Sequence, residues 1–391
     1  MSREERHGPD GRGLHDATSD APGLEEESEA GTGRRGRRRR GAETLMVPEA
    51  EFTSYYGRQI IHTPAWEVPD VPAYLYLGGM AGAAAAMGVA GDLTGNRHLR
   101  RAGRLTASAA SVLSVGFLVH DLGRPSRFLN MLRVFKVTSP LSMGTWILSP
   151  FATFAGAAAV AELRGVLLPV LERVAGARVA GLAAAIAPAV GRASGLGSGL
   201  FGPALSTYTA VLIADTAVPS WHAAYPELPF VFAGSGMASA GGIGMIVSPV
   251  ADAAPARRMA LLGAGLELAA TQRMEHRIGL VAEPFQKGRP GLLLTLAQGS
   301  MAAGSLGALV AGRLGRRGRG ASVVAGVLLN VGAALTRFGV YDAGVESAKD
   351  PKYTVIPQRE RLDAKRAAKA QEAAAAAAST TAPDPATATG A

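Results

Sequence analysis

Long apolar stretches without charge are the feature that most restricts the fold of this chain. Eight of them contain no Asp, Glu, Lys or Arg, except that the sixth includes Glu267. A stretch of about 18 or more such residues can cross the hydrocarbon core of a bilayer as a helix. Most reach that length, and the second is slightly short at 16 residues. They are residues 71–91, 105–120, 141–161, 193–214, 228–251, 259–272, 291–312 and 320–336.

The membrane also decides the secondary structure of these stretches. Inside a bilayer every backbone polar group must bond to protein, and the alternating pattern of barrel strands is absent, so helices are predicted. The sequence therefore predicts an all-α integral membrane protein, a bundle of about eight transmembrane helices with disordered tails. A further apolar run, residues 179–191, has only 13 residues and is predicted to be a separate interfacial or re-entrant piece.

Glycine and alanine are frequent in the apolar part. Gly78 and Gly82 stand four residues apart, as do Gly195 and Gly199. Small residues at this spacing let two helix backbones approach closely in lipid. A coding bias toward Gly and Ala would produce the same pairs, so the sequence leaves both explanations open.

The two ends of the chain differ from the apolar part. Residues 1–50 are polar, charged and rich in glycine, and we expect them to form a disordered basic tail. Residues 62–345 form the predicted eight-helix transmembrane domain, and residues 346–391 a partly disordered C-terminal tail outside the membrane. The arginine run at residues 34–40 is expected to be solvated or to face lipid, rather than to bind nucleic acid.

Several cofactor classes are excluded by the residues that the chain lacks. There is no Cys, so the chain cannot hold an iron–sulfur cluster through thiolates or form a disulfide. Haem between helices would require facing His residues within the membrane, and the seven His lie in tails, in loops or at the ends of spans. No sequence motif for metal binding, ATP use or hydrolysis is present. We therefore expect no haem, iron–sulfur cluster or metal in this chain.

The polar residues are concentrated on one side of the predicted membrane domain. With eight spans, five segments lie on the same side: residues 62–79, 120–140, 215–229, 272–291 and 337–361. We call this side the polar-loop end, and the opposite side, whose loops are mostly Arg, Gly and Ala, the arginine end. Together the five segments predict a docking surface or a ligand site near one membrane surface. For any single aromatic residue, anchoring at the membrane interface is the favoured explanation.

A family resemblance rests on four stretches of the chain. The most specific is DLGRPSRFLNMLRVFKVTSPLSMGTWIL, at residues 121–148. The others are WEVPDVPAYLYLGGMAG at residues 66–82, YTAVLIADTAVPSWHAAYPELPF at residues 208–230 and DPKYTVIPQRERL at residues 350–362. In order, they resemble the signature, the first span, the fourth span with its following loop, and one C-terminal branch of the NrfD family, the polysulfide-reductase-type membrane subunits. The resemblance covers residues 66–362 and leaves out both tails.

The resemblance implies a subunit of a multi-subunit oxidoreductase that crosses the cytoplasmic (inner) membrane several times. Relatives bind a quinone, menaquinone or ubiquinone, near one membrane face. There they dock an iron–sulfur subunit, which connects the site to a molybdopterin-type catalytic subunit. Quinone would then be the only electron carrier in this chain, with proton movement as a further option. Whether the chain is an enzyme in its own right stays open, because the substrate belongs to the catalytic partner.

Quinone chemistry needs groups that exchange protons. Asp121 stands at the end of the second span next to His120, and together they are the predicted catalytic proton relay. Arg124 is expected either to pair with Asp121, which would keep the carboxylate ionised, or to fix the following turn.

A quinone also needs hydrogen-bond donors for its carbonyl oxygens. Tyr208, in the fourth span, is the predicted donor, with helix packing as the alternative. Trp66 and Glu67, just before the first span, are expected to serve the same site. Glu267 lies within the sixth span, where an unpaired charge is costly, so we expect a structural partner or a place on a proton path.

Two other functions remain open from the sequence. The chain could be a membrane anchor for a dehydrogenase complex, without redox activity, or a carrier that conducts protons or ions. Orientation is also open. The arginine end has more basic residues in its short loops, which places the polar-loop end outside, whereas the two basic tails indicate the reverse.

Overall fold

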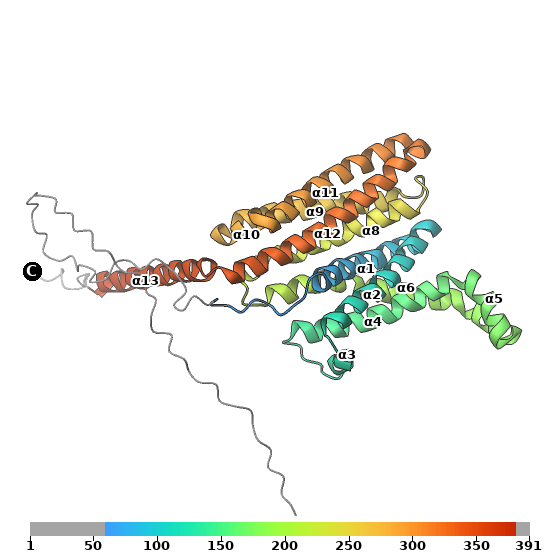
Figure 1. The fold of residues 1–391 in the computed structure, drawn as a ribbon, viewed down its shortest axis with the longest axis horizontal. Coiled ribbons are helices and arrows are strands. Elements are labelled where there is room, and N and C mark those ends of the chain that lie inside the picture. The colour runs from blue at the N-terminus through green and yellow to red at the C-terminus, as the bar shows by residue number, and fades with distance from the viewer. Residues whose placement is uncertain (1–58, 125, 381–391) are drawn as a thin grey trace, which may run out of the picture. The chain divides into compact units, whose positions relative to one another are not determined.

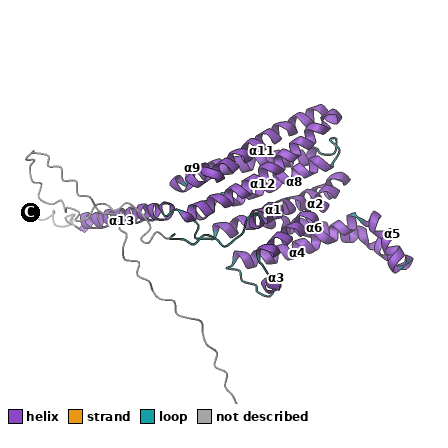
Figure 2. Cartoon of the chain, in the orientation of Figure 1, coloured by secondary structure: helices purple, strands orange, loops and turns teal. Residues whose placement is uncertain are grey.

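A computed structural model describes residues 59–124 and 126–380, and all regular elements among them are helices (Figure 2). Eight long helices form the bundle (Figure 1). They are α1 (Asp70–Leu93), α2 (Arg97–Asp121), α4 (Pro140–Glu162), α6 (Ala177–Ala214), α8 (Leu228–Val247), α9 (Ala254–Arg277), α11 (Gly288–Leu314) and α12 (Arg319–Lys349). The predicted all-α membrane fold is confirmed.

Each predicted span corresponds to one of these eight helices, although the fifth, residues 228–251, runs past the end of α8 at Val247. By length and composition, six segments are long and apolar enough to cross a membrane, and one of them, Gly288–Lys349, contains both α11 and α12. Helix α9 is not among the six, because it carries charged residues along its length in addition to Glu267. The six segments and α9 together account for the eight predicted spans.

The short apolar run at residues 179–191 does not form an element of its own, so the prediction of a piece distinct from the fourth span is wrong. It is continuous with the fourth span in α6, which has 38 residues. The alanine-rich sequence favours helix throughout, and proline within a membrane helix, such as Pro188, is tolerated. Helix α5 (Arg164–Ala175) precedes α6 and packs against it.

Helix α1 is the most buried of the membrane-spanning candidates and packs against α2, α6, α8 and α12. It approaches α6 closely at Gly82 and Gly202. A Cβ atom on Gly82 would lie 2.2 Å from the carbonyl oxygen of Gly202, too close for any other residue without a shift of backbone. Ser206 donates a hydrogen bond to the Gly79 carbonyl across the same interface, at 3.0 Å. The small residues expected from the sequence therefore set the distance between these two helices.

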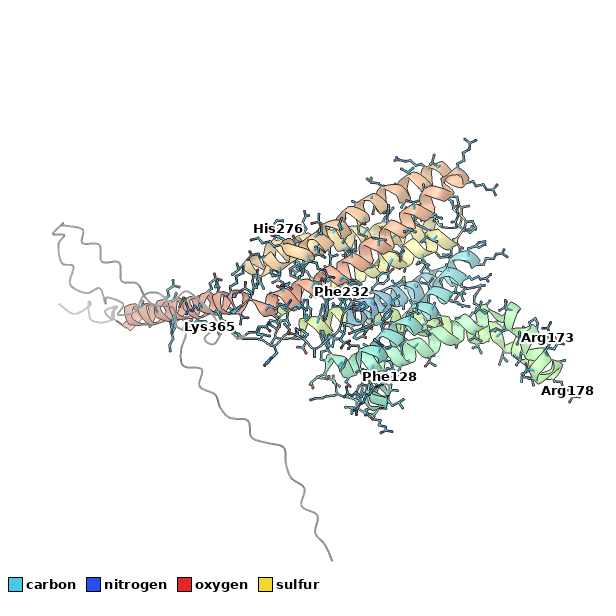
Figure 3. The ribbon with its side chains drawn as sticks, in the orientation of Figure 1. Phe128, Arg173, Arg178, Phe232, His276 and Lys365 are labelled. Atoms are coloured by element: carbon cyan, nitrogen blue, oxygen red, sulfur yellow. The ribbon has the colours of Figure 1, made fainter. Side chains whose placement is uncertain are left out.

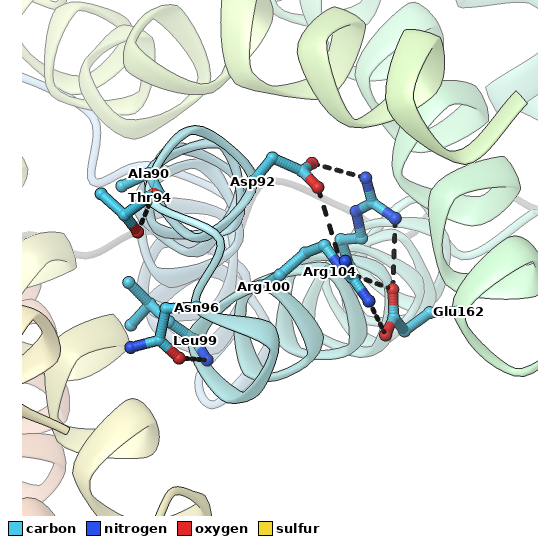
Figure 4. Close-up of polar contacts among 8 residues, drawn as sticks. All are labelled: Ala90, Asp92, Thr94, Asn96, Leu99, Arg100, Arg104 and Glu162. Carbon is cyan, nitrogen blue, oxygen red and sulfur yellow. Dashed lines mark hydrogen bonds and ion pairs between the residues drawn. The ribbon is translucent and has the colours of Figure 1, made fainter. Parts of the chain in front are cut away.

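A cluster of charges closes the arginine end. The buried guanidinium of Arg104 lies 2.5 Å from the Asp92 carboxylate and 3.2 Å from Glu162, and Arg100 contacts the same Glu162 at 3.1 Å (Figure 4). A buried charge is tolerated only when it is paired in this way. The cluster joins α1, α2 and α4. Beside it, the tight turn between α1 and α2 ends at Asn96, whose side chain caps α2 by accepting from the Leu99 amide at 3.0 Å.

The polar-loop end is built from short helices between the long ones. They are α3 (Ser126–Met131), α7 (Pro219–Ala223), the 3₁₀ turn η1 (Gly279–Ala282) and α10 (Glu283–Gln286). A second 3₁₀ turn, η2 (Gly315–Gly318), joins α11 to α12 at the arginine end. Helix α12 ends at Lys349 and thus runs past the domain boundary predicted at residue 345. Helix α13 (Lys352–Thr380) follows it. The predicted tail at residues 1–50 lies outside the described residues, as do residues 381–391 of the second tail.

We predict that Gly82→Ala lowers the thermal stability of the purified protein, because the added methyl group meets the Gly202 backbone. Overpacking of this kind typically costs about 1–3 kcal/mol. Gly156→Ala in α4 is the matched control, since a Cβ there meets no atom within 4 Å. Thermal unfolding in detergent measures both variants. Equal unfolding temperatures for the two would contradict the close α1–α6 contact.

Candidate functional site

The segment before α1 fastens three parts of the polar-loop end together. The Trp66 ring stacks on Trp221 of α7, with ring centres 5.8 Å apart. The Tyr341 hydroxyl, on α12, donates to the Trp66 carbonyl at 2.6 Å. The next amide, of Glu67, donates to the Asp121 carboxylate at 3.1 Å. Trp66 and Glu67 thus lie at the junction of α2, α7 and α12, where the sequence predicted site residues.

Asp121 ends α2 and accepts the Glu67 amide, so one carboxylate oxygen is held by backbone. Arg124 lies apart from it: within the described residues no ion pair joins the two, and Arg124 is exposed in the loop before α3. The first role considered for Arg124, pairing with Asp121, is therefore not seen among the described residues.

His120 has a partner that sequence reasoning did not select. Its Nδ1 lies 2.6 Å from a carboxylate oxygen of Asp70, the first residue of α1. The Asp70 side chain is 6% exposed and the His120 side chain 77% exposed, so the pair connects a buried carboxylate to the surface. The sequence signal that could have identified Asp70 is its position: it is a carboxylate directly after Pro69, at the start of the first span.

Tyr208 points toward α4, where a glycine makes room for its ring. A Cβ atom on Gly144 would lie 2.1 Å from the Tyr208 ring, so a larger residue at 144 would displace the tyrosine. Tyr74, on α1, is buried in the hydrophobic core against which Tyr208 packs. Among the described residues the Tyr208 hydroxyl has no hydrogen-bond partner. It is therefore a free donor.

A cavity of 590 Å³ lies beside this tyrosine, between α4, α6 and α7. Its lining is mainly apolar, and its polar side chains include Tyr208, Asp215 and His222. The Nδ1 of His222 lies 3.2 Å from the Ala214 carbonyl at the end of α6. An Nδ1 proton directed at that carbonyl leaves Nε2 as the acceptor of the neutral ring. The cavity thus combines an apolar wall with a phenol, a carboxylate and an imidazole.

A second buried polar cluster lies deeper in the bundle. The Thr336 hydroxyl donates to the Glu267 carboxylate. Next along α12, Arg337 donates to the Phe232 carbonyl at 2.7 Å, and its guanidinium carbon lies 3.5 Å from the centre of the Phe232 ring. One oxygen of Glu267, two nitrogens of Arg337 and the hydroxyl of Ser235 are buried without a hydrogen-bond partner in the described residues. The cluster thus holds a buried acid and a buried base whose hydrogen-bonding groups are incompletely satisfied within the described residues.

Ion pairs strengthen the outer surface of the polar-loop end. Arg277 binds both carboxylate oxygens of Glu227 at 2.7 Å, and this hydrogen bonding lowers the pKa of Glu227. Hydrogen bonds from Lys287 and then Lys352 lower the pKa of Glu283 to about 2. Because Lys352 begins α13, the second pair joins α13 to α10.

Lys287 also lines a further cavity of 650 Å³, together with Trp66, Arg289 and Lys349 among others. The polar-loop end therefore has charged pairs on its surface in addition to the mainly apolar cavity at Tyr208. Within the described residues, no three side chains of His, Asp or Glu come together in a group that could hold a metal ion.

Comparison of the sequence with known protein families identifies the family of this chain. No curated protein matches the chain. The sequence model of the family described as "Polysulphide reductase, NrfD" matches residues 61–267, more than half of the 391 residues. The match includes all six residues predicted for the site and ends at Glu267, so α11, α12 and the C-terminal stretch at residues 350–362 lie outside it. The chain belongs to the NrfD family and is a multi-pass membrane subunit of the polysulfide reductase type.

Proposed function

We propose that this chain is the quinone-reactive subunit of an oxidoreductase complex in the cytoplasmic membrane. It exchanges electrons with an iron–sulfur partner, which connects it to a molybdopterin-type catalytic subunit. One observation carries this proposal within the family: the Tyr208 hydroxyl, which has no hydrogen-bond partner among the described residues, lines a mainly apolar cavity of 590 Å³ near one end of the bundle.

The residues of this cavity fit a quinone. Val137, Met143 and Val211 provide apolar contacts, and the Tyr208 phenol provides a hydrogen bond for a carbonyl oxygen. When bound, a quinone supplies the acceptor of two electrons and two protons. His222 and Asp215 line the same cavity and can hold a proton there, His222 at its Nε2 because Nδ1 faces the Ala214 carbonyl.

Protons need a route between this site and water. Asp121 is the last residue of α2, so its carboxylate lies at the polar-loop end of the span. His120 is exposed and bound to the buried Asp70, so it can pass protons between that carboxylate and solvent. We therefore assign Asp121 and His120 to proton exchange, and Trp66 and Glu67 to holding the end of α2 in place.

The partner surface in this proposal is the charged outer face of the polar-loop end. The pairs Arg277–Glu227 and Lys352–Glu283 stabilise its loops, while Arg124, Arg127 and Arg133 are exposed around α3. Charged loops of this kind guide and align a protein partner more than they add affinity. An iron–sulfur subunit docked here would lie above the cavity at Tyr208.

The buried Glu267 and Arg337 favour a second candidate function, a carrier that conducts protons. Ionisable residues inside a membrane are expensive and commonly mark an ion path. The unpartnered atoms of both side chains are compatible with such a role. The third option, an anchor without redox activity, accounts for neither the Tyr208 cavity nor the buried pair.

We predict that Tyr208→Phe slows quinone turnover by the purified complex about tenfold, the effect of one lost hydrogen bond of roughly 1.4 kcal/mol. The ring that packs on Gly144 is retained, so assembly should be unchanged. Tyr353→Phe, which removes a phenol outside this cavity, is the control. Oxidation of a soluble quinol analogue is the assay. Wild-type turnover in Tyr208→Phe would reject the assigned cavity.

Asp121→Asn tests proton exchange. Asparagine can still accept the Glu67 amide through its carbonyl oxygen, so the segment before α1 should stay in place. Loss of a general acid or base slows turnover by about 10²–10⁴-fold, and we expect a decrease in that range with normal assembly. Asp363→Asn, on the exposed part of α13, provides the comparison. A variant with normal assembly and normal turnover would assign Asp121 a structural role.

Glu267→Gln separates the redox subunit from the carrier. Glutamine can still accept the Thr336 hydroxyl but has no charge. In proteoliposomes with an imposed membrane potential, our proposal predicts that quinone turnover persists in the variant and that the chain alone passes no protons. Proton flux through the wild-type chain that Glu267→Gln abolishes would instead establish the carrier.

A further inference from the structure

Helix α5 and the first half of α6 form a helical hairpin at the arginine end. The chain reverses at Gly176, whose φ of 86° suits glycine, and α5 packs back on α6. At 1.5 Å per residue, α6 is about 57 Å long, whereas the hydrocarbon core of a bilayer is about 30 Å thick. The hairpin, residues 164–192, therefore extends beyond the ends of the neighbouring helices (Figure 1).

The surface of this hairpin is apolar and exposed. Val166 and Leu182 are each 66% exposed and Val174 82%. Only 22% of the most apolar window of α6 is buried inside the protein, the lowest share among the membrane-spanning candidates. An apolar surface of this kind is not left in water, so lipid or another protein covers it.

The charges of the hairpin distinguish between these two. It carries four arginines, Arg164, Arg173, Arg178 and Arg192, and a single acid, Glu172. Within the described residues none of the four arginines has an ion-pair partner, in contrast to the Arg100 and Arg104 cluster nearby. Arg173 and Arg178 lie at the tip of the hairpin (Figure 3). Basic residues on an apolar helical surface match the anionic headgroups of a membrane.

A cavity of 590 Å³ lies between α4, α5 and α6. Leu168, Leu171 and Ile186 are among its lining residues, and the single charged side chain of the lining is Arg164. Its volume is within the range of about 300–1,000 Å³ of ligand sites. An apolar cavity with one guanidinium suits a molecule that has a long apolar part and an anionic end, and guanidinium binds phosphate in a bidentate manner.

We propose that this cavity binds an anionic phospholipid, with an acyl chain against Leu168 and Ile186 and the phosphate paired with Arg164. A partner's helix at the same surface would have to bring acidic groups to four unpaired arginines, which is costly next to lipid. Anionic headgroups supply that charge without such a cost. The site is independent of the quinone cavity, which lies at the polar-loop end.

Native mass spectrometry of the delipidated full-length protein tests the site with two probes, phosphatidylglycerol and phosphatidylcholine. We expect phosphatidylglycerol to be retained more tightly. Arg164→Gln should weaken its binding about fivefold, the usual contribution of one basic residue near an anionic membrane surface. Arg313→Gln, at the exposed end of α11, is the matched control and should leave binding unchanged. Ala187→Trp fills the cavity while keeping Arg164, and should also lose the lipid.

In the mass spectrometry experiment, three results would overturn the proposal. They are equal retention of the two lipids, equal binding by Arg164→Gln and Arg313→Gln, and displacement of phosphatidylglycerol by millimolar inorganic phosphate, which would indicate a site for free phosphate. A photo-crosslinking residue at Leu171, used in intact membranes, gives a second measurement that does not depend on the folding of Arg164→Gln. An adduct with the mass of a lipid supports the proposal, and an adduct with a protein chain overturns it.

Discussion

The close approach of α1 to its neighbours is the constraint on which the rest of the bundle depends. In lipid there is no hydrophobic force to drive helices together, so packing and hydrogen bonds between helices must do this. The contact of Gly82 with Gly202 brings α6 against α1, and α1 also packs on α2, α8 and α12. Because Asp70 and Tyr74 belong to α1, the same helix that organises the bundle also presents the polar groups of the candidate site.

Most of the fold could be predicted from hydrophobicity alone, because a membrane allows few structures. The eight charge-free stretches each became a long helix, even where Glu267 interrupts the sixth. Residues 179–191 were predicted as a piece distinct from the fourth span because 13 apolar residues are too few to cross a bilayer. A helix that continues past the membrane surface obeys no such limit, and only the three-dimensional structure shows that α6 continues without a break.

The candidate site could be predicted less well, since it depends on pairs between distant parts of the chain. The sequence indicated Asp121 and Tyr208 as polar groups at or within spans, and it placed His120 beside Asp121. The structure instead joins the His120 imidazole on α2 to the Asp70 carboxylate on α1, two residues that are 50 positions apart in the sequence. His222 was one of many polar residues in a loop. Its place in a cavity depends on how α7 folds against the end of α6.

The tight turn between α1 and α2 has a consequence for synthesis. The two helices face each other along their lengths, from the charge cluster at Arg104 to the pair of His120 with Asp70, and the contact between Asp92 and Arg104 spans only 12 residues. Contacts of short sequence separation form quickly. The α1–α2 hairpin can thus complete its own internal pairing before α6 is synthesised, so that the later helices can pack against a pair that has already formed.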